Sequence, residues 1–276
     1  MVKAVAGQYS VKGDLGVHVC SVRGKVKKDI DIYVGDYVDY NDNVIEKVYE
    51  RKNCLIRPYV ANIDALLIVV SVRPAPDWIL VEKLLLNCHQ QKIVPVIVFN
   101  KSDLTNEAEK ILLPYKDEIR TFIVSAKTGY GLNELKKYIA EKLVVFCGQS
   151  AVGKSSLINA LGGKKLETGE LSKRIARGKN TTRHIEIYDT ESGRIADTCG
   201  FSVMESIDIR PEQLVYYYDE FLAVQHKCKF TNCTHIKEPD CEVKKLVSCG
   251  QINKNRYDRY VMLFEELTER RKKLYD

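Results

Sequence analysis

The stretch GQSAVGKS at residues 148–155 decides the fold, because it matches the phosphate-loop pattern G-x-x-x-x-G-K-[ST] in full. It follows an apolar segment, Leu143–Phe146, typical of a buried strand, and a helical pattern begins at Lys154. Its two glycines let the backbone curve so that N–H groups face an anion, and the helix N-terminus adds positive potential. Average residue frequencies produce this pattern by chance in about 1% of chains this long. The stretch therefore predicts a nucleoside triphosphate site in an α/β domain.

Two side chains of this loop are expected to act on the nucleotide. Lys154 would reach the β- and γ-phosphates, and the Ser155 hydroxyl would bind Mg²⁺. The rest of the loop would surround the phosphates mainly with backbone N–H groups. The expected phosphate-binding residues are Gly148, Gln149, Ser150, Ala151, Val152, Gly153, Lys154, Ser155 and Ser156.

Two motifs that precede the phosphate loop in the chain indicate which base is bound. Asn100-Lys101-Ser102-Asp103 matches N-K-x-D directly after an apolar strand pattern. A carboxylate at Asp103 can accept hydrogen bonds from guanine N1–H and the 2-amino group, a donor pair that adenine lacks. The lysine of this motif would lie along the base, and the asparagine would tie it to the phosphate loop. Ser125-Ala126-Lys127 matches the second guanine loop, so the sequence predicts GTP rather than ATP.

Two further segments, which follow the phosphate loop in the chain, are expected to sense the γ-phosphate. Asp197-Thr198-Cys199-Gly200 fits D-x-x-G, in which Asp197 would hold Mg²⁺ through water and the Gly200 N–H would contact the γ-phosphate. The polar residues 177–182 (RGKNTT) suit a switch loop, and either Thr181 or Thr182 would complete the Mg²⁺ coordination. The expected catalytic residues are Lys154, Ser155, Thr181, Thr182, Asp197 and Gly200.

Position 201, directly after D-x-x-G, affects the expected rate of hydrolysis. Many GTPases carry a glutamine there that orients the attacking water. Phe201 cannot perform this role. The sequence therefore predicts slow intrinsic hydrolysis, with the water-positioning group supplied by a partner or by another loop.

A cluster of cysteines and one histidine predicts a metal site near the C-terminus. The spacing Cys228-x4-Cys233-x-His235-x5-Cys241 offers three thiolates and one imidazole, a set that binds structural zinc tetrahedrally. His226 and Cys249 are alternative fourth ligands. From Ala223 to Asp276, twelve Lys and Arg residues stand against eight Asp and Glu residues, which suits a phosphate backbone or a solvated helix. Buried structural positions are expected for Cys20, Cys54, Cys88 and Cys147.

The pattern along the chain predicts a multidomain α/β protein. Short β-like pieces before Pro58 suggest a small barrel such as an OB-fold, although a plain β-subdomain that caps its neighbour is the alternative. From Leu66, apolar strands alternate with helical stretches, which is typical of a mostly parallel sheet. We expect an OB-fold RNA-binding domain at 1–60, a GTPase domain at 61–222 and an α-helical zinc-binding domain at 223–276.

Composition limits the location and the class of partner. The longest apolar run, Ala65–Val72, is too short to span a bilayer, and nine cysteines without a secretory signal favour a reducing compartment. We therefore expect a cytoplasmic protein with no membrane partner. The net charge of +6 permits a polyanionic partner without proving one.

The motif order is unusual, because an ordinary GTPase begins with the phosphate loop and ends with the guanine loops. This circular permutation, an N-terminal barrel and the Cys-x4-Cys-x-His-x5-Cys site together resemble the RsgA/YjeQ family of bacterial GTPases that act on the small ribosomal subunit. The linker Arg57–Asp64 (RPYVANID) also resembles the family's R-P-x-V-A-N-V-D. Two departures are Cys199, where the family has proline, and Lys179-Asn180, where it has Arg-His; Asn180 puts any hydrolytic role of that histidine in doubt.

The resemblance implies a function beyond what the residues alone indicate. It implies an OB-fold that contacts ribosomal RNA, a zinc domain that helps to dock on the subunit, hydrolysis stimulated by the subunit, and release of a late assembly factor. The implied partners are GTP or GDP with Mg²⁺ and the small subunit with its rRNA, not DNA; a monomer is the default. The alternative is a nucleotide-gated RNA-binding scaffold in which hydrolysis is incidental.

The permutation also suggests a route for signalling. The segment from Asp197 to about Met204, which begins with D-x-x-G, is followed within a few dozen residues by the zinc domain. We hypothesise that loss of the γ-phosphate relaxes this segment and changes how the zinc domain docks.

Overall fold

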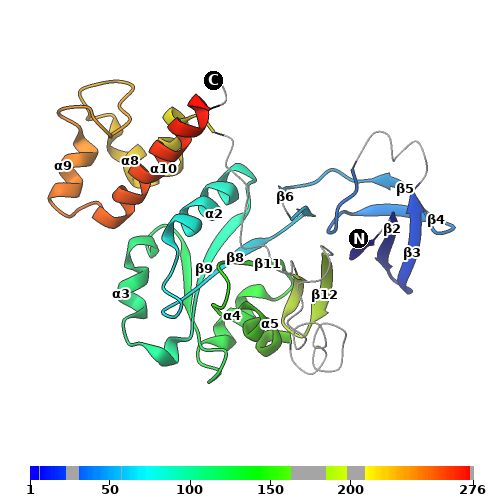
Figure 1. Ribbon diagram of the computed structural model, residues 1–276. Coiled ribbons are helices and arrows are strands. Elements are labelled where there is room, and N and C mark those ends of the chain that lie inside the picture. Colours follow the sequence, from blue (N-terminus) through cyan, green and yellow to red (C-terminus); the bar gives the residue numbers. More distant parts are fainter. Residues whose placement is uncertain (6, 23–30, 57, 163–184, 198–208, 274–276) are drawn as a thin grey trace.

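The structure is a computed structural model that describes residues 1–5, 7–22, 31–56, 58–162, 185–197 and 209–273. Three units follow one another along the chain (Figure 1): N-terminal strands, a central sheet with helices, and a group of C-terminal helices. No helix within these ranges combines the length and the apolar character that crossing a bilayer requires.

The N-terminal unit is built from short strands. They pair in the order β1-β2-β3-β5-β4, and β3 is parallel to β5 whereas the other neighbours are antiparallel. The fifth strand lies between the third and the fourth, so the strands do not follow one another in simple up-and-down order, and this agrees with the predicted OB-fold. Val11, Cys20 and Ile45 point into its small core. The strands are β1 (Lys3–Val5), β2 (Gln8–Gly13), β3 (Gly16–Val22), β4 (Val38–Asn41) and β5 (Val44–Val48).

The central sheet confirms the predicted mostly parallel arrangement. Its order is β10-β9-β8-β11-β13-β12, with all neighbours parallel except the β12–β13 hairpin. At its far side β12 pairs with β1 through Lys3 and Glu186, so the two sheets are continuous. The strands are β8 (Ala65–Ser71), β9 (Val94–Asn100), β10 (Arg120–Ile123), β11 (Leu143–Cys147), β12 (Glu186–Thr190) and β13 (Gly193–Asp197), and the pair β6 (Cys54–Leu55) and β7 (Val60–Ala61) precedes them.

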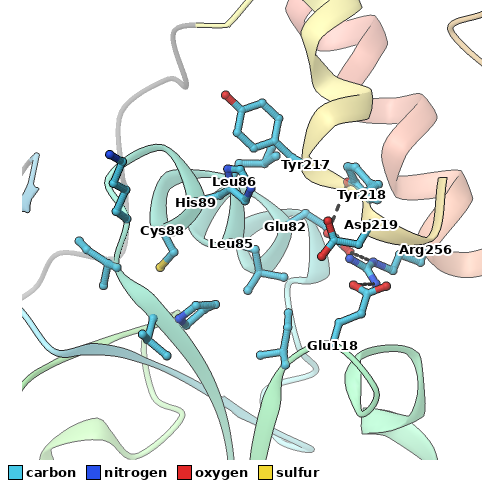
Figure 2. A pocket seen from close by; sticks show the side chains of 15 residues that line it. Glu82, Leu85, Leu86, Cys88, His89, Glu118, Tyr217, Tyr218, Asp219 and Arg256 are labelled. Atoms are coloured by element: carbon cyan, nitrogen blue, oxygen red, sulfur yellow. Dashed lines mark hydrogen bonds and ion pairs between the residues drawn. The ribbon is translucent and has the colours of Figure 1, made fainter. Parts of the chain in front are cut away.

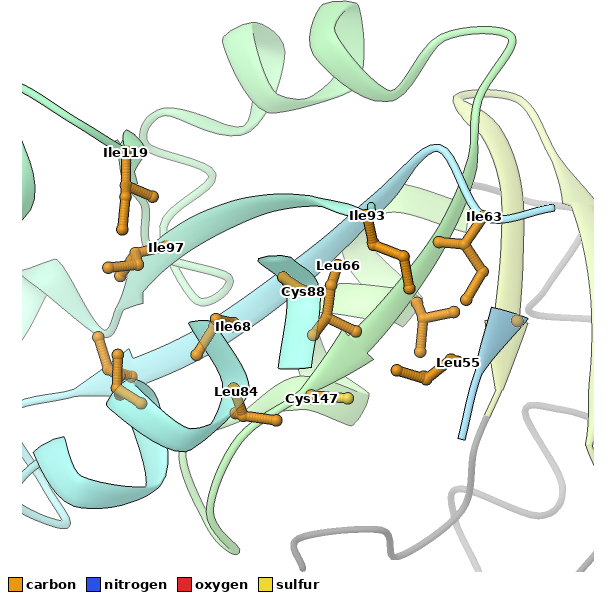
Figure 3. Packing of buried hydrophobic residues seen from close by; sticks show 14 of the residues in the cluster. Leu55, Ile63, Leu66, Ile68, Leu84, Cys88, Ile93, Ile97, Ile119 and Cys147 are labelled. Carbon is orange, nitrogen blue, oxygen red and sulfur yellow. The ribbon is translucent and has the colours of Figure 1, made fainter. Parts of the chain in front are cut away.

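Helices cover both faces of this sheet. Strands β8 and β11 are buried along their whole length, as expected for parallel strands between two helical layers. Figure 3 shows Leu66 and Ile68 of β8 against Leu84 and Cys88 of α2 on one face. On the other face, Leu67 and neighbouring residues pack on α4 and α5. The helices are α2 (Trp78–Gln90), α3 (Ala108–Leu112), α4 (Leu132–Ile139) and α5 (Lys154–Gly162), with short 3-10 turns η1 (Ser102–Leu104) and η2 (Leu113–Tyr115).

Helix α4 ends earlier than the helical pattern of residues 132–142 indicates. Its last residue is Ile139, Ala140 leaves the helix with ψ 133°, and Glu141 takes a left-handed φ of 62°. The chain must reverse direction here to enter β11, so Ala140 and Glu141 form a turn instead of continuing the helix.

The C-terminal unit is helical, as predicted. Its core contains Phe221, Val243, Tyr260 and Leu263, and Leu86 of α2 joins the same cluster. Helix α2 therefore packs against both the central sheet and the C-terminal unit. The elements are η3 (Pro211–Tyr217), α8 (Asp219–Gln225), α9 (Glu242–Ser248) and α10 (Lys254–Lys272).

Candidate nucleotide site and metal centre

The sequence motifs meet at one edge of the central sheet. The segments that follow β9, β10 and β11 all leave the carboxyl ends of parallel strands. In open α/β sheets this edge is where ligands bind. Strand β13 is parallel to β11 and ends at Asp197, so this residue also lies at that edge.

The phosphate loop needs glycine at two positions for different reasons. Gly148 has φ +131°, and a Cβ there would lie 2.3 Å from the Val69 carbonyl oxygen. Gly153 has φ +93°, and its Cβ would lie 2.4 Å from Nδ2 of Asn100. The first glycine permits close contact with β8, and the second permits close contact with the N-K-x-D segment. Ala151 also has a left-handed φ, +64°, which is uncommon for a residue with a Cβ.

The lysine of the loop is held by the loop itself. Lys154 is the first residue of α5, and its Nζ donates hydrogen bonds to the carbonyl oxygens of Gly148 and Gln149, both at 2.7 Å. An ammonium group has three donors, so one remains for an added ligand. Burial lowers the pKa of Lys154. A half-buried cation beside a glycine-rich loop suits an anionic ligand such as a phosphate.

Asn100 joins the three motifs directly. Its side chain is buried at the end of β9, where Nδ2 donates to the Val152 carbonyl oxygen at 2.9 Å. Its Oδ1 accepts the N–H of Ala126 at 3.1 Å. One amide group therefore links the N-K-x-D segment to the phosphate loop on one side and to the Ser-Ala-Lys loop on the other.

Asp103 and Ser125 form the second link between the guanine motifs. The Ser125 hydroxyl, itself buried, donates to Oδ1 of Asp103 at 2.6 Å. This hydrogen bond lowers the pKa of Asp103, whose carboxylate is exposed. An ionised, oriented carboxylate with free acceptor capacity can receive the two donors of a guanine edge.

Lys101 makes contacts that the sequence did not indicate. It has a left-handed φ of 60°, and its Nζ donates to the carbonyl oxygens of Arg73 and Ala151, each at 2.7 Å. The segment 73–77 between β8 and α2 therefore borders the site. No local motif marks that segment, so only the tertiary structure could reveal it.

Some predicted site residues lie outside the described residues. These are Thr181, Thr182, Thr198, Cys199, Gly200 and Phe201. For Asp197 the structure gives the backbone position at the end of β13. The predicted Mg²⁺ ligands and the hydrolytic step therefore stay predictions from the sequence.

The predicted metal ligands do come together. Candidate ligand atoms of Cys228, Cys233, His235 and Cys241 all lie within 4.8 Å of one another. Nδ1 of His235 is 3.3 Å from the Cys241 sulfur and 3.7 Å from the Cys228 sulfur. Ligand atoms bound tetrahedrally to zinc at its usual bond lengths lie about 3.3–3.8 Å apart. The geometry thus fits zinc, with Nδ1 of the histidine facing the thiols.

Neighbouring groups shape this centre. His235 has a left-handed φ of 61°, and its carbonyl oxygen accepts the Tyr257 hydroxyl at 2.7 Å. The Tyr260 hydroxyl donates to the Thr234 carbonyl oxygen at 2.7 Å, so α10 holds the metal loop twice. Burial alone would raise the pKa of Glu238, but hydrogen bonds from the Thr234 N–H and hydroxyl and from the Ile236 N–H lower it to about 2.

The alternative fourth ligands are not part of the cluster. The group found among the described residues contains neither His226 nor Cys249. Cys249 is exposed, and its thiol donates to the Leu246 carbonyl oxygen at 3.4 Å. The buried positions predicted for Cys20, Cys88 and Cys147 are confirmed, whereas Cys54 is half-buried.

Comparison with known proteins gives consistent matches along the chain. A family model described as RsgA GTPase matches residues 48–207. "Small ribosomal subunit biogenesis GTPase RsgA" of Thermotoga petrophila is 41% identical over 92% of this chain and 90% of its own. "Small ribosomal subunit biogenesis GTPase RsgA 2" of Oceanobacillus iheyensis is 42% identical over 98% and 97%. The crystal structure of YjeQ from Thermotoga maritima aligns with TM-score 0.82 at 35% identity over 97% of this chain and 96% of that one. YloQ, titled a circularly permuted GTPase, aligns with TM-score 0.79 at 31% identity over 98% and 94%.

Proposed function

Because the chain belongs to the RsgA GTPase family, we propose that its GTP hydrolysis serves late maturation of the small ribosomal subunit. The observation that carries the GTPase assignment is the side chain of Asn100, which joins both guanine motifs to the phosphate loop. In this proposal the protein binds the small subunit and its rRNA. The subunit stimulates GTP hydrolysis, and the protein releases a late assembly factor. A monomer working in the cytoplasm, where subunits mature, completes the proposal.

The geometry and the motifs support a proposed role for each residue at the nucleotide. Asp103 would read the guanine edge, the Ala126 N–H would meet O6, and Lys154 would hold the β- and γ-phosphates. Bound Mg²⁺ would supply charge neutralisation between the phosphates. Ser155, one of Thr181 and Thr182, and Asp197 would hold that ion, the aspartate through water.

We further propose that the N-terminal unit contacts rRNA through stacked aromatic and cationic side chains. The rings of Tyr33 and Tyr59 stack with centroids 4.7 Å apart, and the Arg51 guanidinium lies 4.2 Å from the Tyr33 ring centre. Lys47 lies 4.4 Å from the Tyr49 ring centre. Tyr49 and Tyr59 are exposed. Exposed rings beside cations suit unpaired bases and phosphates.

The Tyr33 and Tyr59 pair gives a test of this surface. The double change Tyr33→Ala and Tyr59→Ala is expected to weaken binding to small subunits by roughly tenfold or more, since stacking contributes about 1–3 kcal/mol per base. Binding would be measured by co-sedimentation, with GTP turnover of the free protein as a check on folding. The matched control, Tyr33→Phe with Tyr59→Phe, keeps both rings and should bind nearly as well. Equal binding by the alanine and wild-type proteins would remove this surface from the proposal.

Turnover measurements test the function itself. Phe201 stands where many GTPases place the water-orienting glutamine, so we expect slow hydrolysis by the free protein. Small subunits should accelerate it by about a hundredfold or more, the scale on which one transition-state group acts. Large subunits should have little effect, and Lys154→Ala should remain inactive throughout. Absence of stimulation would instead favour the alternative, a nucleotide-gated scaffold with incidental hydrolysis.

A further inference from the structure

Gln149 forms a bridge that its place in the phosphate loop does not require. Its half-buried side chain leaves the loop and reaches the segment before α2. Oε1 accepts the Asp77 N–H at 2.7 Å, and Nε2 donates to the Ala75 carbonyl oxygen at 3.0 Å. The same residue's backbone oxygen accepts a hydrogen bond from Lys154. Gln149 thus fixes the peptide that holds the phosphate-binding ammonium.

The segment that Gln149 reaches is the start of α2. Asp77 is the N-cap of this helix, and its carboxylate accepts the Leu80 N–H at 3.0 Å. Lys101 adds a second tie, because its ammonium bridges the Arg73 and Ala151 carbonyl oxygens. The segment 73–77, which leads into α2 and includes its N-cap, is therefore held to the phosphate loop by two side chains.

Helix α2 connects the two larger units of the protein. One side, with Val81, Leu84 and Cys88, packs into the sheet core. The other side, with Ile79 and Leu86, packs into the core of the C-terminal unit. A helix moves largely as a rigid body, so a shift at its first turn is carried to both cores.

A buried polar cluster fastens the same helix to α10. Figure 2 shows Glu82 of α2 beside Tyr218, with Arg256 reaching Glu118. Glu82 is 2% exposed and its Oε1 accepts the Tyr115 hydroxyl at 2.8 Å and Arg259 Nε at 3.1 Å. Buried groups of this kind are costly to separate, because each would lose its partner in a low-dielectric environment.

A pocket lies beside this cluster. It has a volume of about 370 Å³, is partly open to solvent, and lies between α2, the start of β9 and the C-terminal unit, lined in part by Leu85, Ile93 and Tyr217. Closely packed interfaces resist rearrangement, whereas unfilled volume leaves room for a small change of angle. Docking of α10 on α2 is therefore sensitive to the position of α2.

We propose that Gln149 is a positioning residue that couples the phosphate loop to the C-terminal unit through α2. In one direction, a nucleotide that reorders the loop changes the position of α2 and the docking of α10. In the other direction, a partner that moves the C-terminal unit changes the position of Lys154 and therefore the affinity for the phosphates, because coupling between sites is reciprocal. This inference rests on the proposed nucleotide site and adds a second route to the one suggested for residues 197–204.

Hydrogen exchange at saturating nucleotide tests the coupling. In the wild-type protein, a nonhydrolysable GTP analogue should change the exchange of α10 amides, residues 254–272, by several-fold relative to the nucleotide-free protein. Gln149→Ala should remove this change. It should also weaken binding of the analogue by about tenfold, because a loop that its side chain no longer holds must be ordered when the nucleotide binds. Gln149→Glu preserves the side-chain size but places a carboxylate oxygen against the Ala75 carbonyl, so it should also lose the response.

A control variant separates this route from general damage. Lys83→Ala removes an exposed ion pair to Glu266, 2.7 Å long, between α2 and α10, and should keep the α10 response. An undiminished α10 response in saturated Gln149→Ala, or no response in the wild-type protein, would overturn the inference. Either result would leave nucleotide binding and subunit-stimulated hydrolysis, which are measured separately, unaffected.

Discussion

Asp103→Asn is expected to change the preferred nucleotide from GTP to xanthosine triphosphate. Guanine presents two donors, N1–H and the 2-amino group, and the Asp103 carboxylate can accept both. An amide offers one acceptor and one donor group, so it mismatches the 2-amino group but matches xanthine, which has a carbonyl at that position. A site built for a polar group rejects the mismatched analogue strongly, so GTP affinity should fall about 10³-fold or more.

Competition titration against a fluorescent GDP analogue would measure both affinities. Xanthosine triphosphate should bind the variant within about tenfold of GTP binding to the wild-type protein, since the hydrogen-bond count is restored. Asparagine can still accept the Ser125 hydroxyl, so the loop should keep its geometry. Asp117→Asn, an exposed change in the same domain, is the matched control and should leave the preference for GTP unchanged. If Asp103→Asn still preferred GTP, the assigned base-reading role would be wrong.

Loss of the metal is expected to unfold the C-terminal unit while the nucleotide domain stays folded. The proposed zinc ligands lie beside the core formed by Phe221, Val243 and Tyr260, and α10 is fastened to the metal loop through Tyr257 and Tyr260. Structural zinc contributes roughly 10–16 kcal/mol in small metal-dependent peptides, far more than one core contact. Cys233→Ser, or chelation, should therefore abolish protection from hydrogen exchange across residues 209–273.

Cys249→Ser provides the matched control for this experiment. Its thiol belongs to the same unit but is exposed and lies outside the ligand cluster. Metal analysis should find about one zinc per chain in the wild-type protein and in Cys249→Ser, and close to none in Cys233→Ser. Binding of GDP should persist in all three, because the guanine and phosphate motifs belong to the central sheet. Zinc-free wild-type protein with a folded C-terminal unit would contradict the assignment.

Local motifs carried most of the prediction of the site. Residues 148–155 and 100–103 each form one continuous backbone segment, so their chemistry is readable without the fold. The alternation of strands and helices after Leu66 was equally readable, because burial between helical layers requires apolar strands. The group that the structure brings together, Cys228, Cys233, His235 and Cys241, is the one that the spacing indicated, and its role as a zinc site stays a prediction.

Features that depend on distant segments were not readable. Nothing near Gln149 indicates that its amide reaches Ala75 and Asp77, more than seventy residues earlier in the chain. His235 takes a left-handed backbone that the sequence does not mark, and its Nδ1 lies 3.7 Å from the Cys228 sulfur. The early end of α4 has the same origin, since the requirement to enter β11 overrides a helical pattern. Tertiary geometry decided each of these cases.

The pairing of β1 with β12 also covers one edge of the central sheet. The Val2 carbonyl oxygen accepts the Ile187 N–H at 2.8 Å, and Lys3 forms an ion pair with Glu186 at 3.0 Å. Without β1, the β12–β13 hairpin would present a free row of backbone donors and acceptors, which is a template for aggregation. The N-terminal strand therefore belongs to both units, because it pairs with β2 in the N-terminal unit and also covers the β12 edge of the central sheet.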